Sequence, residues 1–222
     1  MPRPKTLPDN EVLEAAYRLM HQHGPEALTF SLLAQACGLS ASTLVQRFKS
    51  KARLIQSILS YAWDRLDEKT AMLAAKVPKN VEGAIRLLTT LSKDYGEIEA
   101  YADSLMILRE DLRNPALRAR GATWKAALSK ALDDCLAEVS HAPRGIGLLM
   151  ASQWQGSLLW WSFDPQGSVE DFVEDNLRRF VSAIIGAAPA ARRRTAGRTR
   201  EVALTGMAAG RSQSRKKGGR PS

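Results

Sequence analysis

The sequence predicts an all-α protein of about nine helices, with a small N-terminal three-helix bundle ahead of a larger helical domain. Between residues 9 and 187, apolar residues recur every three or four positions, the spacing of one helix face. Turn-forming pairs such as Gly24-Pro25 and Asn114-Pro115 separate these stretches. No stretch of useful length alternates apolar and polar residues as a half-buried strand does, so we expect no sheet.

Basic residues are concentrated at the two ends of the 222-residue chain. Residues 1–60 hold seven basic and four acidic residues, a net charge of +3. Residues 61–187 hold fifteen basic and eighteen acidic residues, a net charge of −3, and residues 188–222 hold ten basic residues and one acidic residue, a net charge of +9. This distribution favours a nucleic-acid module at the front, a near-neutral regulatory or pairing body, and a basic tail.

The composition is that of an ordinary globular protein, 45% hydrophobic and 25% charged. The first twenty residues are charged and helical in period, so no cleavable signal is expected. Cys37 and Cys135 lie in helical patterns, and we interpret them as reduced packing residues of a cytoplasmic protein. Histidine occurs at three positions, and no Ser/His/Asp or Cys/His set, metal spacing or Gly-rich phosphate loop is visible. We therefore expect no enzyme, no cofactor and no metal site.

The first eight residues, MPRPKTLP, carry three prolines together with Arg3 and Lys5. Prolines this dense keep a backbone extended. A basic extended arm can lie in the minor groove of DNA. The alternative is a disordered terminus with incidental charge.

The first helix is predicted from Asp9, a favourable N-cap, to about His23, where Gly24 and Pro25 end it. His21 and His23 could suggest a metal site. Side chains two residues apart on a helix do not face each other, so we interpret both as favourable to the helix C-terminal dipole. The predicted apolar stripe consists of Val12, Leu13, Ala16, Tyr17, Leu19 and Met20.

Two short helices joined by a tight turn follow. The first runs from about Ser31 to Cys37 with Thr29 as its cap, Gly38-Leu39-Ser40 turns the chain, and the second runs from Ala41 to about Arg47. The predicted buried positions of this pair of helices are Leu32, Leu33, Ala36 and Cys37 in the first helix, and Leu44 and Phe48 around the second. This is the outline of a helix-turn-helix, whose second helix enters the DNA major groove.

The exposed side of the second short helix is left with Ala41, Ser42, Val45 and Gln46. Gln46 can pair with an adenine edge, and Val45 or Ala41 can touch a thymine methyl group. Ser40 caps this helix at the amide of residue 42 or 43, where a phosphate can also bind.

The next helix, the fourth, begins with an unfavourable charge distribution. Lys49, Lys51 and Arg53 place positive charge at a helix N-terminus, where negative residues are preferred by a few tenths to about 1 kcal/mol each. We expect no stabilising role for them there. A phosphate arriving from outside would neutralise the group and accept the free amides.

Residues 28–54, LTFSLLAQACGLSASTLVQRFKSKARL, resemble the DNA-binding region of the TetR family of transcriptional regulators. The resemblance covers residues of about 9 to 60 and rests on Leu33-Ala34, Cys37-Gly38-Leu39-Ser40, Thr43-Leu44 and the run from Phe48 to Leu54. It implies that Thr29, Thr43 and Lys51 contact phosphates. One departure is Val45, where the family usually has an aromatic residue, and Arg47 and Lys49 can compensate. The predicted DNA contacts are Arg3, Lys5, Thr29, Ser40, Ala41, Ser42, Thr43, Val45, Gln46, Arg47, Lys49 and Lys51.

The helix that opens at Ser50-Lys51 is predicted to continue from Leu54 to about Lys76, and further helices are predicted from Val81 to about Tyr95, Tyr101 to Arg113 and Ala116 to about Ser140. Residues 145–163 then contain no charged side chain. Their glutamines, serines and glycines make a poor membrane span, so we expect a helix buried on both sides, against its own body and against a partner subunit or ligand. Ser168 and Asp171 cap the last helix.

The resemblance implies a homodimer that pairs through the last two helices and a small-molecule pocket between the long helices. The dimer interface is predicted at Trp161, Phe172, Val173, Leu177, Phe180, Val181 and Ile184. The predicted pocket residues are Tyr95, Tyr101, Met106, Trp124, Gln153 and Trp154.

The tail from residue 188 has no sustained apolar stripe and is expected to be disordered. Its Gly219-Arg220-Pro221 among basic residues loosely resembles an AT-hook, and the alternative is a solubilising tail with nonspecific phosphate attraction. The predicted domains are an arm (1–8), a helix-turn-helix domain (9–60), a regulatory and dimerisation domain (61–187) and the tail (188–222).

The leading interpretation is a homodimeric, ligand-responsive repressor on a palindromic operator in double-stranded DNA, with an unknown small-molecule effector and no membrane. The alternative is an architectural protein that coats DNA through its basic arm and tail and binds no small molecule.

Overall fold

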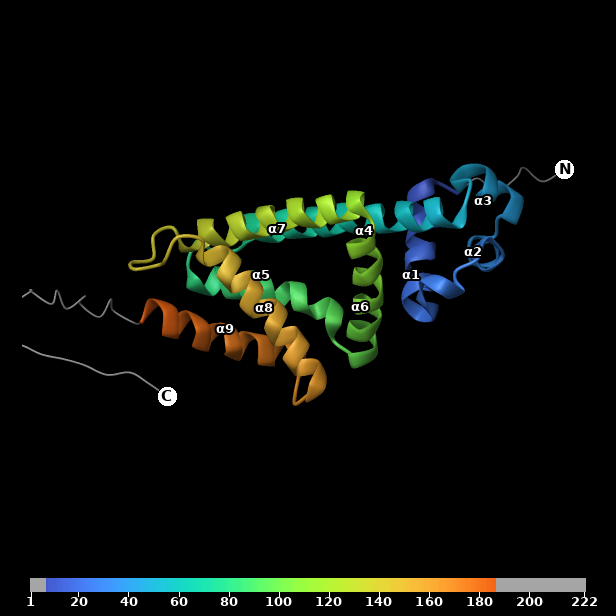
Figure 1. Ribbon diagram of the computed structural model, residues 1–222. Helices are drawn as coiled ribbons and strands as arrows, with labels where there is room; N and C mark the ends of the chain where they lie inside the picture. The colour runs from blue at the N-terminus through green and yellow to red at the C-terminus, as the bar shows by residue number, and fades with distance from the viewer. Residues whose placement is uncertain (1–6, 187–222) are drawn as a thin grey trace, which may run out of the picture. The chain divides into compact units, whose positions relative to one another are not determined.

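A computed structural model describes residues 7–186, all of which belong to one compact unit. The predictions for Arg3, Lys5, the tail and its AT-hook-like sequence lie outside the described residues. The described chain is all-helical, as the sequence predicts, with nine α-helices, one short 3₁₀ turn and no strand (Figure 1). The helices are α1 (Asp9–Ala27), α2 (Phe30–Cys37), α3 (Ala41–Phe48), α4 (Lys51–Lys76), α5 (Val81–Ser92), η1 (Lys93–Tyr95), α6 (Ile98–Arg113), α7 (Pro115–Leu136), α8 (Ile146–Phe163) and α9 (Val169–Ile185).

Side-chain caps start most of these helices where the sequence places them. Thr29 accepts from the amide of Leu32, Ser40 from that of Thr43, and Ser168 from that of Asp171. The prediction that Asp9 caps α1 is wrong. Pro8 occupies the cap position without a side-chain hydrogen bond, and Asp9 is already in the first turn.

The predicted end of α1 at His23 also needs correction. Gly24 adopts φ 76°, a left-handed value, and the helix resumes at Pro25 for a last turn that ends at Ala27. Glycine takes this conformation without the steric cost that a Cβ brings, and proline suits the first position of a helical turn. The helix is therefore kinked where the sequence predicts that it stops.

Two hydrophobic cores lie along the chain. The first joins α1, α2, α3 and the first half of α4, and Ile107 of α6 and Leu117 of α7 complete it. The second joins α5, α7, α8 and α9. The long helix α4 contacts both α1 and α7, so it connects the helix-turn-helix to the body (Figure 1).

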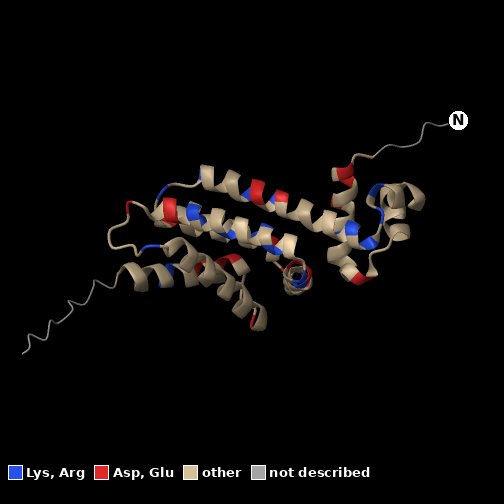
Figure 2. Cartoon of the chain, turned by 45° about the horizontal axis from the view of Figure 1, so that its top comes forward, with Lys and Arg blue, Asp and Glu red and all other residues tan. Residues whose placement is uncertain are grey.

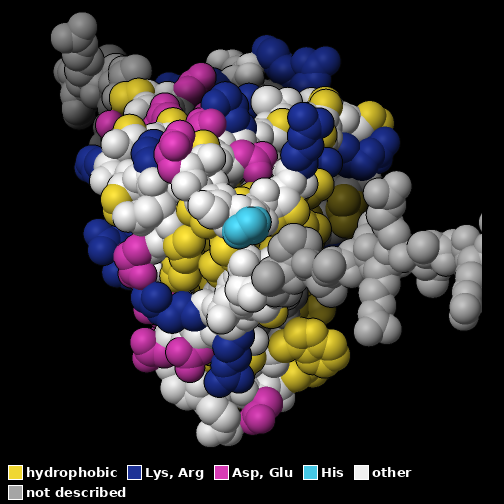
Figure 3. All heavy atoms as spheres, turned by 90° about the vertical axis from the view of Figure 1, so that its left-hand side faces the viewer, with side chains coloured by type: hydrophobic (Ala, Val, Ile, Leu, Met, Phe, Trp, Pro, Cys, Tyr) yellow, Lys and Arg dark blue, Asp and Glu magenta, His cyan; other side chains and the backbone are white. Residues whose placement is uncertain are grey.

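The body helices differ from prediction at their ends. α5 stops at Ser92 and continues only as the 3₁₀ turn to Tyr95, α6 begins three residues early at Ile98, and α7 ends at Leu136 rather than near Ser140. Viewed from the end of the body away from α2 and α3, side chains of both charge signs are mixed among hydrophobic patches (Figure 3). Among the described helices, none has the length and apolar character needed to cross a membrane.

Candidate nucleic-acid interface

The turn between α2 and α3 is fixed by backbone geometry. Gly38 has φ 66°, and the amides of Gly38 and Leu39 both donate to the carbonyl of Ala34. This closure, typical of a glycine after a helix end, sets the angle at which α3 leaves α2. The arrangement is a helix-turn-helix at one end of α4 (Figure 1).

Helix α3 divides into a buried face and an exposed face, as its spacing predicts. Leu44 is fully buried and Phe48 nearly so, whereas Ser42, Val45 and Gln46 are exposed. Val45 is 43% exposed, so an aliphatic side chain faces solvent next to the amide of Gln46. The exposed face therefore carries the two kinds of group that read base edges, an apolar contact and an amide.

Three hydroxyl groups gather at the start of α3. Ser40 Oγ lies 2.8 Å from both Ser42 Oγ and Thr43 Oγ1 and also accepts from the amide of Thr43. They surround the positive end of a helix dipole, where an anion is favoured. Thr29, at the start of α2, is exposed and its hydroxyl accepts from an amide in the same way.

Lys49 sits at a strained corner between α3 and α4. Its backbone has φ 66° and ψ −42°, and the amide of Ser50 donates to the carbonyl of Phe48 at 2.7 Å across it. This is a γ-turn with positive φ, rare for a residue other than glycine. The Lys49 side chain is exposed, and basic residues cluster at this corner (Figure 2).

Lys51 has a structural partner that the sequence does not reveal. Its Nζ donates to the carbonyl of Glu26 at 2.6 Å, in the last turn of α1. A cation at a helix C-terminus is stabilising, by about 0.3–1 kcal/mol. The expectation that this lysine has no stabilising role at the start of α4 is therefore wrong, because the partner helix end lies 25 residues away in sequence.

Arg47 is also engaged within the protein. Its Nη1 donates to the carbonyl of Leu7 at 2.7 Å and to Asp9 Oδ1 at 3.2 Å. The structure thus places the predicted contacts of α3 together at one end of the molecule, but turns one guanidinium nitrogen toward the N-terminal segment.

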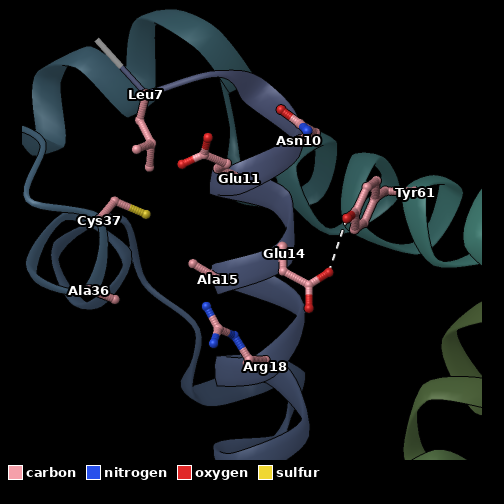
Figure 4. A pocket seen from close by; sticks show the side chains of 9 residues that line it. All are labelled: Leu7, Asn10, Glu11, Glu14, Ala15, Arg18, Ala36, Cys37 and Tyr61. Carbon is pink, nitrogen blue, oxygen red and sulfur yellow. Dashed lines mark hydrogen bonds between the residues drawn. The ribbon is translucent and has the colours of Figure 1, made fainter. Parts of the chain in front are cut away.

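A shallow groove of about 410 Å³ lies behind this module, between α1, α2 and α4 (Figure 4). Glu14 in this groove accepts from Tyr61 at 3.0 Å and from Arg65 at 2.8 Å. Ala36, predicted to be buried, is exposed here, and Cys37 lines the groove while remaining 4% exposed. The lining residues are Leu7, Asn10, Glu11, Glu14, Ala15, Arg18, Ala36, Cys37 and Tyr61.

The predicted pocket residues are only partly brought together. The rings of Trp124 and Trp154 lie 6.3 Å apart, and those of Tyr95 and Tyr101 lie 5.8 Å apart. Met106 is 48% exposed, on the outside of α6. Gln153 is half-buried on α8, the helix that also carries Trp154.

Sequence reasoning missed a third tryptophan in this group. The ring of Trp63 lies 5.9 Å from that of Trp124, and its Nε1 donates to Asp111 Oδ1 of α6 at 3.1 Å. The other end of the row is fixed where Trp154 Nε1 donates to Ser92 Oγ at 2.8 Å. Only the helical period of α4 pointed to Trp63, and a period does not identify cross-helix neighbours.

Buried titratable groups lie where α1 contacts α6. Burial raises the pKa of Tyr17 to about 12 and lowers the pKa of His21. The charge of Asp103 on α6 acts in the opposite direction on the pKa of His21. Burial likewise raises the pKa of Asp111, against the effect of the Trp63 hydrogen bond. The charged forms of these three side chains are therefore unfavourable at this contact. No group of three or more potential metal ligands occurs in the described part of the chain.

The predicted dimer residues mostly face inward. Trp161, Val173, Leu177 and Val181 are buried in the protomer's own core. The other three, Phe172, Phe180 and Ile184, are half-buried against that core.

An exposed apolar surface lies on the other side of α8, and we call it the α8 face; α6 also carries exposed apolar side chains. Trp160 is 68% exposed and Phe163 73% exposed. The absence of charge over residues 145–163 was the available signal, but it does not tell which side faces out. The α8 face consists of Leu148, Leu149, Leu159, Trp160 and Phe163.

Residues 12–58 match the model of the bacterial regulatory proteins of the tetR family. The HTH-type transcriptional repressor ComR of Escherichia coli K12 is 34% identical over 83 residues, 37% of this chain and 40% of that protein. This chain is similar to TetR-family regulators over its helix-turn-helix region. It spans less than half the length of this curated relative, and the match of the TetR model is confined to the helix-turn-helix region and the start of α4.

A likeness in fold to solved structures extends over the body as well. A transcriptional regulator from Saccharomonospora viridis in complex with choline is 18% identical, with a TM-score of 0.62 over 78% of this chain and 95% of that one. AibR in complex with isovaleryl coenzyme A and operator DNA is 19% identical, with a TM-score of 0.55 over 79% and 96%. At these levels of sequence identity, the likeness shows a shared fold alone.

Proposed function

We propose that this chain is a TetR-family DNA-binding transcriptional repressor whose α3 reads the major groove. The observation that carries the proposal is the composition of the α3 surface: Val45 and Gln46 are exposed beside the Ser40–Ser42–Thr43 hydroxyl group. Base-reading groups and phosphate-binding groups thus share one short helix. Lys49, at the corner with α4, supplies a cation to the same side of the module.

We infer that two copies bind a palindromic operator, joined through the α8 face. Large apolar side chains this exposed on a monomer are typical of an interaction site. Gly156 lies among them on α8, and a Cβ added there would meet no atom within 4 Å. Another helix can therefore approach the backbone closely at Gly156. A dimer of this kind presents two α3 helices to half-sites about 34–36 Å apart.

A small-molecule effector is proposed to act on the body, near the Trp124–Trp154 row. AibR and the Saccharomonospora viridis regulator were each solved with a small molecule bound. Aromatic walls with a few polar groups suit such ligands. An effector releases DNA only if it binds the DNA-bound and DNA-free conformations with different affinity.

Selection of bound fragments from a random DNA pool tests the function. We expect enrichment of one inverted repeat and, by light scattering, a complex that contains two chains per site. Equal affinity for selected and random DNA would support the architectural alternative, in which the basic ends coat DNA without reading it.

A further inference from the structure

A second groove, of about 460 Å³, lies where α6 and α7 join beside the first half of α4 (Figure 1). We call it the α4–α7 groove. Its lining shares no residue with the Trp124–Trp154 row or with the groove between α1, α2 and α4. Small-molecule sites usually have volumes of about 300–1,000 Å³, and the α4–α7 groove falls in that range.

The floor of the α4–α7 groove is apolar. Leu59 of α4 and Leu117 of α7 line it and are buried, and Ile55 lies half-buried one turn before Leu59. All three side chains pack in the first hydrophobic core. The floor is therefore the outer surface of the core that carries the helix-turn-helix, and an apolar group placed there would leave water.

The charged side chains at the rim favour an anion. Arg113 is 65% exposed, and its carboxylate neighbour is Glu110 at 3.9 Å. Arg109 already holds the same Glu110 carboxylate at 3.1 Å. The next acid, Asp111, turns away to accept from Trp63 Nε1. Two arginines thus share one carboxylate, which leaves one positive charge in excess beside the apolar floor.

Amide groups at the rim add hydrogen-bond donors. Within residues 7–186, the exposed side-chain amide of Gln56 has no hydrogen-bond partner, and that of Asn114 uses its oxygen, which accepts from the amide of Ala116. Asn114 and Pro115 also begin α7, so the positive end of a 22-residue helix opens onto the groove. An anion is favoured at such a helix end.

The end of α6, which meets the same groove, does not cancel this effect. The carbonyls of Glu110 and Asp111 accept from the backbone amide of Asn114. The carbonyl of Leu112 accepts from Arg118 Nη1 at 2.8 Å. The last carbonyls of α6 are therefore occupied within the protein, whereas the donors of the rim face the groove.

We propose that the α4–α7 groove is a second small-molecule site, which takes a monocarboxylate with an apolar body. The carboxylate lies against Arg113 and the start of α7, and the apolar body covers Leu59 and Leu117. A DNA phosphate carries the same charge, but it has no apolar part to cover this floor. The groove therefore fits a small amphipathic acid better than it fits nucleic acid.

Such an occupant would touch both parts of the protein at once. Its apolar body would lie on α4 and on the core of the helix-turn-helix, and its carboxylate would lie on α6 and α7 of the body. A ligand that binds two arrangements of these helices with different affinity shifts the balance between them. This effect on DNA binding rests on the proposed function, whereas the binding of the acid does not.

A titration followed by nuclear magnetic resonance tests the site in the full-length protein without DNA. Isoleucine methyl groups are labelled, Ile55→Val assigns the Ile55 signal, and hexanoate is the probe. We expect a saturable shift of the Ile55 signal with a dissociation constant on the order of 1 mM. The uncharged hexanamide should bind roughly tenfold more weakly.

Three outcomes of this titration would overturn the proposal. The first is the absence of a saturable shift at Ile55. The second is equal affinity for hexanamide, because the site would then not select a carboxylate. The third is a shift confined to Ile85 and Ile146 of the second core, which would place hexanoate in the body.

Arg113→Gln tests the charge at the rim, and Arg86→Gln is its matched control. Arg86 is an exposed arginine of α5 outside the groove. We expect Arg113→Gln to weaken hexanoate binding by roughly five- to tenfold and Arg86→Gln to leave it unchanged. Since Arg113 is mostly exposed, its loss should not unfold the protein. Equal hexanoate affinity in the two variants would refute the role of Arg113.

Operator affinity, measured at constant ionic strength, tests the effect on DNA. Hexanoate at about three times its dissociation constant should change the operator affinity of the wild type by at least about twofold, and that of Arg113→Gln by less. An unchanged wild-type affinity would refute this coupling. If the wild type binds no selected DNA, the proposed function falls, and the titration without DNA still decides whether the groove is a site.

Discussion

Replacing Lys49 by glycine should stabilise the protein and weaken its binding to DNA. The γ-turn holds Lys49 at φ 66°, which costs an L-residue about 1–2 kcal/mol. Glycine removes that strain but loses about 0.5–1 kcal/mol more conformational entropy on folding. At the midpoints of these two ranges the net gain is about 0.75 kcal/mol. In a domain of this size it corresponds to a rise in Tm of about 1–4 °C.

Lys49→Ala separates strain from charge. Alanine loses the ammonium group as glycine does but keeps a Cβ at positive φ, so its Tm should stay near that of the wild type. Thermal unfolding followed by circular dichroism at one fixed protein concentration compares the three proteins, because the proposed dimerisation would make Tm concentration-dependent. Equal Tm values for the glycine and alanine variants would refute the strained turn. Both variants should lower the salt slope of operator affinity by about 0.9, the effect of one lost phosphate contact.

Three further predictions concern other parts of the molecule. Lys51→Ala should lower stability by about 0.3–1 kcal/mol in chemical denaturation by removing the cation from the end of α1, whereas Gln46→Ala should leave stability unchanged and alter the base preference found by fragment selection. Trp160→Asp should give monomers in light scattering with an unchanged circular dichroism spectrum, since the side chain is mostly exposed in the protomer; a stable dimer would place the interface elsewhere. Asp111→Asn should stabilise the protein at neutral pH. Burial raises the folded-state pKa of Asp111 above its unfolded value, so the wild-type protein loses stability as pH rises through the folded-state pKa. The gain from the substitution should vanish at pH below the unfolded pKa, and a pH-independent gain would contradict this cause.

Local features of the fold followed from sequence, and long-range partners did not. The four-residue spacing of Leu44 and Phe48 predicts which side of α3 is buried, and hydroxyl residues at Thr29 and Ser40 predict caps. These depend on neighbours within one helical turn. Lys51 and Glu26 meet only in the folded protein, because α2 and α3 lie between them in sequence, so no pattern around Lys51 could identify its acceptor.

The same limit applies to the body. Helical spacing showed that α9 has an apolar stripe, but not that the stripe is covered by its own protomer. The uncharged run of α8 showed that the helix has little polar surface, but not that Trp160 and Phe163 face outward. Periodicity identifies an apolar face of a helix. What packs against that face depends on the arrangement of the other helices. The predicted domain boundary near residue 60 and the individual site residues remain predictions.

The kink at Gly24 has a consequence for how the reading module is oriented. By turning the last turn of α1, Gly24 aims the carbonyl of Glu26 at the ammonium of Lys51, which opens α4. A Cβ at Gly24 would meet nothing within 4 Å, so the only barrier to substitution there is torsional. A larger residue would fit into the space, yet it would change the backbone angle and move the Glu26 carbonyl away from Lys51 at the start of α4. We therefore expect the orientation of α3 to depend on the backbone angle of Gly24, although Gly24 lies in α1 and outside the helix-turn-helix.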